Sequence, residues 1–277
     1  MNPLIPPEAL RTMHGQTGLA VLDATYFLPS EAQDAQANFL ASHVPGAHFF
    51  DLDRIADTSS ALPHMLPAPD AFAAAVAAMG ISNETRVVVY DQRGIFSAPR
   101  VWWMFRVFGH DNIQVLDGGL PAWIKAGGDV ASGPARDMPK SGFTPRFRPE
   151  MVRSLQDISA NLTTRAAKLL DARGAARFHA QVPEPRLGMR SGHIPGAINI
   201  PFTALLADGH YLPPDQLRQI FLQAGIEDSS SLIASCGSGV TACVVTLGLV
   251  LAGLPEAAIY DGSWSEWGGR QDTPIEV

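Results

Sequence analysis

Short apolar runs alternate with longer segments of helical periodicity along the whole chain. Residues 87–90 (VVVY) and 232–235 (LIAS) are apolar at almost every position, whereas residues 70–80 (DAFAAAVAAMG) carry apolar residues at helical spacing. Strands that are apolar on both faces are typical of parallel sheets covered by helices on both sides. The pattern therefore predicts an α/β fold.

The hydrophobic pattern of the first half returns in the second half. Four pairs of segments match in the same order, and they are VLDATYF (21–27) with LLDARGAARF (169–178), SHVPGAHFFDLD (42–53) with SGHIPGAINIPF (191–202), VVVYD (87–91) with LIASC (232–236), and VLDGGLPAW (115–123) with IYDGSWSEW (259–267). Repetition over this length indicates a duplicated domain. We expect two tandem domains, each with a parallel sheet flanked by helices.

A segment rich in Pro, Gly and Arg separates the two repeats. Residues 133–153 lack sustained apolar periodicity, as expected of a chain that passes from one domain to the next. We assign residues 1–132 to the first domain, 133–153 to a linker with the boundary near 145, and 154–277 to the second domain.

Composition excludes several classes of function. The net charge of -7 and the sequence pI near 5.6 give no electrostatic reason to bind nucleic acid or an anionic membrane. The N-terminus has none of the features of a secretory signal, and no apolar run reaches membrane-spanning length. We therefore expect a cytoplasmic protein.

The only two cysteines are Cys236 and Cys243, and their spacing argues against a disulfide. No second cysteine pair or closely spaced histidine pair accompanies them, so the sequence predicts no metal site. Cys243 falls inside an apolar helical segment and is assigned to the core.

Cys236 stands at the end of a predicted strand, before a glycine-containing loop and a helix. Glycines at 237 and 239 allow consecutive N–H groups to turn inward and form an anion site, to which the helix N-terminus adds its dipole. A cysteine with a pKa of about 8.5 is only about 3% thiolate at pH 7, and lowering the pKa by two units requires about 2.7 kcal/mol of anion stabilisation. We expect the loop to supply it, although a small buried cysteine is the alternative interpretation.

These features resemble the rhodanese sulfurtransferases over nearly the whole chain. The resemblance rests on two tandem domains, the H-x-P-G-A motifs at His43 and His193, Asp91 at the counterpart of Cys236, and the loop CGSGVTA. The loop is similar to that of the 3-mercaptopyruvate sulfurtransferases, since thiosulfate sulfurtransferases usually carry basic residues at the positions of Gly237 and Ser238.

The resemblance implies that Cys236 takes sulfur from 3-mercaptopyruvate as a persulfide, releases pyruvate, and passes the sulfur to cyanide or a thiol acceptor such as thioredoxin. It implies no cofactor. Because Asp91 cannot carry a sulfane atom, the first domain is expected to be catalytically silent and to supply one wall of a cleft.

The resemblance also implies roles for further residues. Arg177 and Arg186 would bind the carboxylate and carbonyl of the donor, since the guanidinium fork suits a carboxylate, and Gly237, Gly239, Val240 and Thr241 would surround the transferred sulfur. Ser238, His64 and Asp53 would form a relay that polarises the carbonyl or moves a proton. The alternatives are solvated surface charge for the arginines, a satisfied polar residue for His64, and a cap or ion-pair member for Asp53.

Other residues shared by the two repeats are assigned to structure. Recurrence in both halves, of which only one has the cysteine, favours a structural role for His43, His193, Asp23, Asp171, Trp123 and Trp267.

Two other functions remain as rivals, and a third is disfavoured by the loop sequence. A thiosulfate sulfurtransferase would use the same cysteine, and a sulfur-carrier module would form the persulfide without turnover of small donors. A cysteine phosphatase needs an arginine six residues after the cysteine, where this chain has Ala242.

Overall fold

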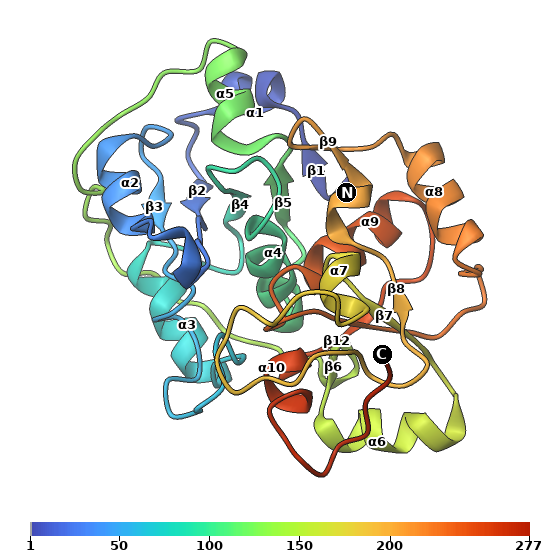
Figure 1. The fold of residues 1–277 in the computed structure, drawn as a ribbon. Helices are drawn as coiled ribbons and strands as arrows, with labels where there is room; N and C mark the ends of the chain where they lie inside the picture. Colours follow the sequence, from blue (N-terminus) through green and yellow to red (C-terminus); the bar gives the residue numbers. More distant parts are fainter. Residues whose placement is uncertain (1) are drawn as a thin grey trace. The chain divides into compact units, whose positions relative to one another are not determined.

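The computed structural model describes residues 2–277 (Figure 1) and divides the chain into two compact units. The first unit holds the residues up to Thr58, Leu66–Arg148 and Asp208–Tyr211, and the second holds Ser59–Met65, Pro149–Ala207 and Leu212–Val277. Ser59–Met65 comes from the first half of the sequence but belongs to the second unit. Asp208–Tyr211 comes from the second half but belongs to the first unit.

The structure divides the predicted linker between the two units. Residues 133–148 belong to the first unit and 149–153 to the second, where they form the 3-10 helix η2 (Pro149–Met151) and the edge strand β6 (Val152–Arg153). A strand of two residues is too short to produce a periodic pattern, so the sequence gives no sign of it.

The first unit is built on a five-stranded parallel sheet. Its strands run in the order β1 (Leu4–Ile5), β5 (Ile113–Leu116), β4 (Arg86–Tyr90), β2 (Leu19–Asp23) and β3 (His48–Phe49). Its helices are α1 (Pro7–Met13), the 3-10 helix η1 (Pro29–Glu31), α2 (Ala35–Ala41), α3 (Pro69–Ala78), α4 (Ala98–Val107) and α5 (Gly119–Lys125).

Strand β4 shows why this sheet is apolar on both faces. Val88 and Tyr90 belong to a core cluster that includes residues of α1, α2 and α5. Side chains alternate along a strand, so Val87 and Val89 face the other side, and α4 packs against β4 and β5. All four side chains are fully buried.

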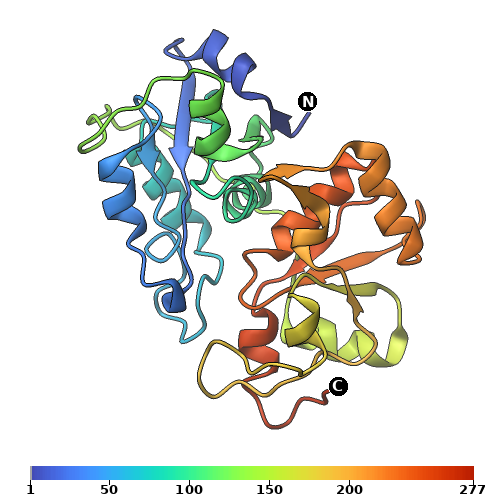
Figure 2. The same cartoon turned by 45° about the horizontal axis from the view of Figure 1, so that its top comes forward.

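The second unit repeats this arrangement. Its parallel sheet has the order β6, β12 (Ala258–Tyr260), β11 (Leu232–Ser235), β7 (Lys168–Asp171) and β8 (Ile198–Asn199), which matches the order in the first unit strand for strand. The remaining elements of this unit are α6 (Leu155–Thr164), α7 (Ala175–Phe178), η3 (Phe202–Leu205), β9 (Leu206–Ala207), α8 (Pro214–Gln223), α9 (Ala242–Leu251) and α10 (Ser263–Trp267), whereas β10 (His210–Tyr211) lies in the segment that belongs to the first unit. Figure 2 gives a second view of both sheets and their covering helices. The predicted α/β duplication is confirmed.

The two H-x-P-G-A histidines are structural, as predicted. His43 Nδ1 lies 2.8 Å from the carbonyl of Phe39 and stacks on its ring, and His193 Nδ1 lies 3.0 Å from the carbonyl of Phe178 and stacks likewise. Each histidine therefore ties its turn to the neighbouring backbone.

The tryptophans at matched positions of the two repeats, Trp123 and Trp267, make the same kind of contact. Trp123 and Trp267 are buried, and each donates its indole N–H to a backbone carbonyl, that of Asp129 and that of Pro274. They are core anchors in both units.

Within residues 2–277, no helix combines the length and the apolar character that crossing a bilayer requires.

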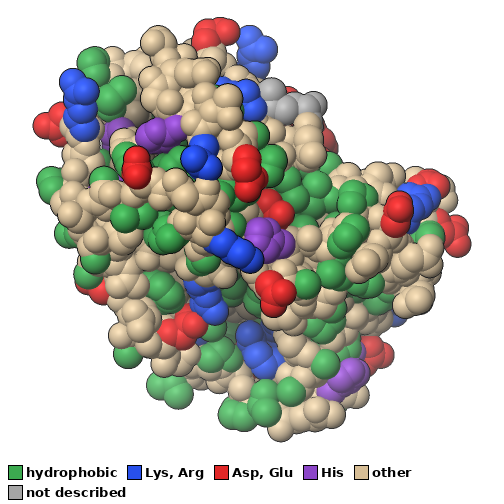
Figure 3. All heavy atoms as spheres, turned by 90° about the horizontal axis from the view of Figure 1, so that it is seen from above, with side chains coloured by type: hydrophobic (Ala, Val, Ile, Leu, Met, Phe, Trp, Pro, Cys, Tyr) green, Lys and Arg blue, Asp and Glu red, His purple; other side chains and the backbone are tan. Residues whose placement is uncertain are grey.

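The molecular face drawn in Figure 3 carries acidic and basic side chains in a mixed arrangement, without a large patch of either charge.

Candidate active site

Cys236 directly follows β11 and precedes α9, at the carboxyl end of a central strand, where ligands bind in open α/β sheets. The residue is only 2% exposed. Burial alone would fit a core cysteine, so the surroundings of the sulfur must decide its role. Cys243 is fully buried in α9 and donates its Sγ–H to the Gly239 carbonyl (3.3 Å), which confirms its assignment to the core.

The loop after Cys236 holds a set of backbone donors without acceptors. Over residues 2–277, the N–H groups of five positions find no hydrogen-bond acceptor, and these positions are Gly237, Ser238, Val240, Thr241 and Ala242. Buried backbone donors are almost always paired. Five such groups in a turn that opens a helix make a concave site with positive potential.

The matching loop of the first unit shows what such a site holds. There the Asp91 carboxylate accepts hydrogen bonds from the N–H groups of Phe96, Ser97 and Ala98 (2.8–3.0 Å) and of Arg93 (3.0 Å). Ala98 begins α4, as Ala242 begins α9. In the first unit the anion is built into the chain, so the equivalent amides of the second unit suit an anionic sulfur on Cys236.

Ser263 holds the two ends of the loop. Its Oγ accepts the N–H groups of Cys236 and Gly239 (both 3.1 Å) and donates to the Tyr260 carbonyl (2.8 Å). Ser263 adopts a φ of 50°, which is rare for a residue with a side chain, and its counterpart Gly119 has a φ of 56°. The strained backbone of Ser263 indicates that its hydroxyl is needed to bind the loop, whereas the first unit has a glycine at this position.

The two predicted arginines lie beside the loop. A Cβ on Gly237 would stand 3.3 Å from Arg177 Nη2 and 3.9 Å from Arg186 Nη1. Gly237 therefore leaves room for both guanidinium groups, which come from outside the loop as the resemblance implied. Arg186 Nη1 also lies 3.4 Å from Ser265 Oγ, a weak contact that leaves most of its donors available.

Arg177 is oriented by a carboxylate. Its Nε and Nη2 donate to Glu184 (3.2 and 2.5 Å), whose side chain is 3% exposed. Arg173 donates to the same carboxylate (2.8 Å) and pairs with Asp171. Burial acts to lower the pKa of Arg173, but the two carboxylates outweigh it and raise the pKa, so this arginine stays charged. In this ion-pair network two guanidinium groups face two carboxylates, and Arg186 adds a third guanidinium beside Gly237.

His64 and Ser238 are brought together. His64 Nδ1 lies 3.0 Å from Ser238 Oγ, and both residues are buried. His64 has a φ of 59°, an uncommon conformation that is found preferentially where the surroundings fix a functional side chain. Segment 59–65 belongs to the second unit, which explains how a histidine from the first half of the sequence reaches the loop.

Asp53 belongs to the first unit and lies on an exposed turn, where its N–H donates to Asp51 Oδ1 (3.0 Å). Its membership in the relay with His64 and Ser238 stays a prediction. Residues 2–277 contain no group of three or more His, Cys, Asp or Glu placed to hold a metal ion.

Sequence reasoning missed Ser263 and Glu184. A signal existed for Ser263, because DGSW stands where the first repeat has DGGL, so a serine replaces a glycine next to the loop. Glu184 has no counterpart in the first repeat, and its pairing with Arg177 depends on the fold of the segment between them.

The rhodanese-like domain family matches this chain twice, over residues 6–126 and 154–270. The duplicated parallel sheet and the strand-end loop agree with this match. The chain belongs to the rhodanese family.

Among curated relatives, the 3-mercaptopyruvate sulfurtransferase of Escherichia coli K12 is 42% identical over 259 residues, covering 93% of this chain and 92% of the relative. The thiosulfate sulfurtransferase of Cricetulus griseus is 44% identical over 264 residues, covering 94% and 88%. The crystal structure of the 3-mercaptopyruvate enzyme SseA from Escherichia coli superposes with a TM-score of 0.87 at 37% identity, covering 95% of this chain and 99% of that one.

Proposed function

We propose that this chain is a 3-mercaptopyruvate sulfurtransferase that works through a persulfide on Cys236. Relatives that use either donor are similar at 42–44% identity, so overall similarity does not choose between the donors. The choice rests on the chemistry of the loop.

The proposal rests mainly on where the positively charged side chains lie relative to the Cys236 loop. The loop itself has no basic side chain, and the two guanidinium groups stand next to Gly237. Thiosulfate is a compact dianion whose charge stays close to the transferred sulfur, whereas 3-mercaptopyruvate has one charge on a carboxylate several bonds away. Arginines outside the loop suit the second geometry because they bind a carboxylate through two hydrogen bonds.

The first stage is attack of the Cys236 thiolate on the sulfur of 3-mercaptopyruvate. The C–S bond breaks, its electrons form the enolate of pyruvate, and the proton of the donor thiol ends on the enolate carbon. The products are pyruvate and the persulfide anion. Arg177 and Arg186 hold the organic anion, and the unpaired amides stabilise the charge on sulfur.

In the second stage an acceptor attacks the outer sulfur and restores the Cys236 thiolate. A thiolate acceptor or cyanide is sufficient for this step. Thioredoxin as the acceptor and the cytoplasm as the location remain predictions from the sequence.

We assign Ser238 to the donor carbonyl, with His64 as its proton partner and Asp53 as the third member. General acid or base catalysis of this kind contributes about 10²–10⁴-fold. We expect Ser238→Ala and His64→Ala each to slow pyruvate release by that range in single-turnover measurements, with the double variant no slower than the slower single variant. Effects that multiply would show that the two side chains act separately.

Donor preference tests the proposal. We expect kcat/KM with 3-mercaptopyruvate to exceed that with thiosulfate by at least about 100-fold, because the loop lacks charge to hold the sulfonate. Equal or reversed values would identify a thiosulfate sulfurtransferase. Persulfide formation without turnover on either donor would identify a carrier module.

A further inference from the structure

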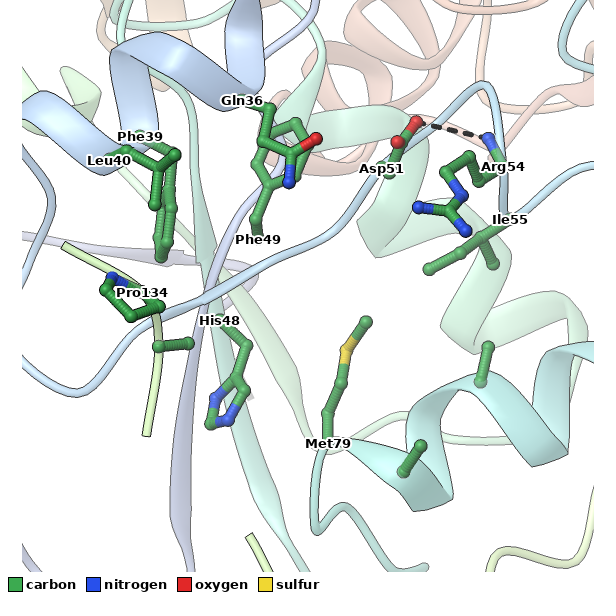
Figure 4. A pocket seen from close by; sticks show the side chains of 13 residues that line it. Gln36, Phe39, Leu40, His48, Phe49, Asp51, Arg54, Ile55, Met79 and Pro134 are labelled. Carbon is green, nitrogen blue, oxygen red and sulfur yellow. Dashed lines mark hydrogen bonds between the residues drawn. The ribbon is translucent and has the colours of Figure 1, made fainter. Parts of the chain in front are cut away.

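The first unit contains a cavity of about 420 Å³ that is separate from the residues of the sulfur-transfer site. It lies between α2, β3, the turn at 51–55, the end of α3 and residues 134–135, and every lining residue belongs to the first unit (Figure 4). Pockets of about 300–1,000 Å³ are the usual size for small-molecule ligands.

The walls of the cavity are apolar and aromatic. Phe39 and Phe49 contribute rings whose centroids are 5.7 Å apart, and Ile55 and Met79 line the cavity beside them. Methionine adapts its shape and makes favourable contacts with aromatic rings. These walls suit a ligand with a flat apolar body.

Arg54 supplies the charge. Its guanidinium forms no hydrogen bond or ion pair with any residue in 2–277, and Figure 4 shows it extending over the cavity. Asp51 uses Oδ1 to accept the N–H groups of Asp53 and Arg54 (3.0 and 3.1 Å) and does not pair with the guanidinium. His48 is engaged with the Arg136 carbonyl (3.0 Å).

An unpaired guanidinium at the rim favours a carboxylate, which it binds through two hydrogen bonds. Asp51 remains on the same rim, and its negative charge disfavours a ligand with two charges. The charge pattern therefore selects a monoanion.

We propose that this cavity binds a small monocarboxylate with an apolar ring, the ring between Phe49 and Met79 and the carboxylate on Arg54. The lining of this cavity contains none of the residues assigned to sulfur transfer, although Asp53 lies in the same turn as Asp51 and Arg54. The site gives the domain without a nucleophile a binding role of its own.

Titration of the full chain with 3-phenylpropionate, followed by calorimetry, tests the proposal. We expect saturable binding to the wild type and at least about tenfold weaker binding of the neutral analogue 3-phenylpropanol. Arg54→Gln should weaken binding of the acid at least about tenfold. Ala75→Phe, which fills the cavity from the half-buried face of α3, should abolish it.

Lys140→Gln removes an exposed charge that does not line this cavity and should leave binding unchanged, and circular dichroism checks that each variant folds. Absence of saturable binding to the wild type would overturn the proposal, as would equal affinities for the wild type and Arg54→Gln. Binding lost in Arg186→Ala but kept in Arg54→Gln would place the probe at the sulfur-transfer site and also overturn it.

Discussion

Replacing Cys236 by serine is expected to abolish release of pyruvate from 3-mercaptopyruvate, with a loss of more than about 10⁴-fold in kcat. A hydroxyl has almost no anionic form at neutral pH, and an oxygen at this position cannot form a persulfide. The measurement is pyruvate production coupled to lactate dehydrogenase.

Cys243→Ala is the matched control, because Cys243 lies in α9 with its thiol bonded to a backbone carbonyl. This variant should keep activity within about threefold of the wild type, since removal of one weak donor costs little. Turnover retained by Cys236→Ser would exclude the covalent mechanism. An equal loss in both cysteine variants would point to damage of the fold instead.

Replacing Arg186 by alanine is expected to raise the KM for 3-mercaptopyruvate about 10- to 100-fold. A hydrogen bond between charged groups contributes about 1.5–3 kcal/mol, and each 1.4 kcal/mol corresponds to about tenfold. Arg186 has only one weak contact within the protein, so nearly all of its binding capacity is available to the donor. Initial rates over a range of donor concentrations provide the value.

Arg186→Lys should give an intermediate KM, because lysine keeps the charge and loses the planar fork. Arg270→Ala is the control for a general loss of positive charge, since Arg270 is exposed and paired with Asp272. A KM unchanged by Arg186→Ala, or raised equally by Arg270→Ala, would contradict the assigned carboxylate clamp.

Most of the fold could be predicted because its signals are local or repeated. The run VVVY predicted β4, and the four matched segments predicted two tandem domains, each with a parallel sheet, which the structure has. The division of the chain at 148 was harder to predict. The segment 59–65 has no pattern that assigns it to the second unit, and β6 is only two residues long.

The site was predictable wherever residue type and loop position were sufficient. Cys236 and its glycines define the loop by sequence alone, and Arg177 and Arg186 followed from the resemblance. Ser263 and Glu184 act through contacts made in the folded chain, with Ser263 bonded to amides 24 and 27 residues away.

The role of Asp91 in its own loop is visible only in the folded chain. From the sequence, the first domain was predicted to be catalytically silent because the carboxylate of Asp91 cannot carry sulfur. In the structure its carboxylate receives four backbone N–H groups. The first unit thus retains an anion site, with the anion supplied by its own side chain.

The most direct test of the account is mass spectrometry of the protein after one addition of 3-mercaptopyruvate without an acceptor. We predict a mass increase of one sulfur atom, located on the peptide that contains Cys236, with one pyruvate formed per chain and loss of the added sulfur after cyanide. Pyruvate formed while Cys236 carries no added sulfur would contradict the central claim that the loop amides stabilise a persulfide on this residue.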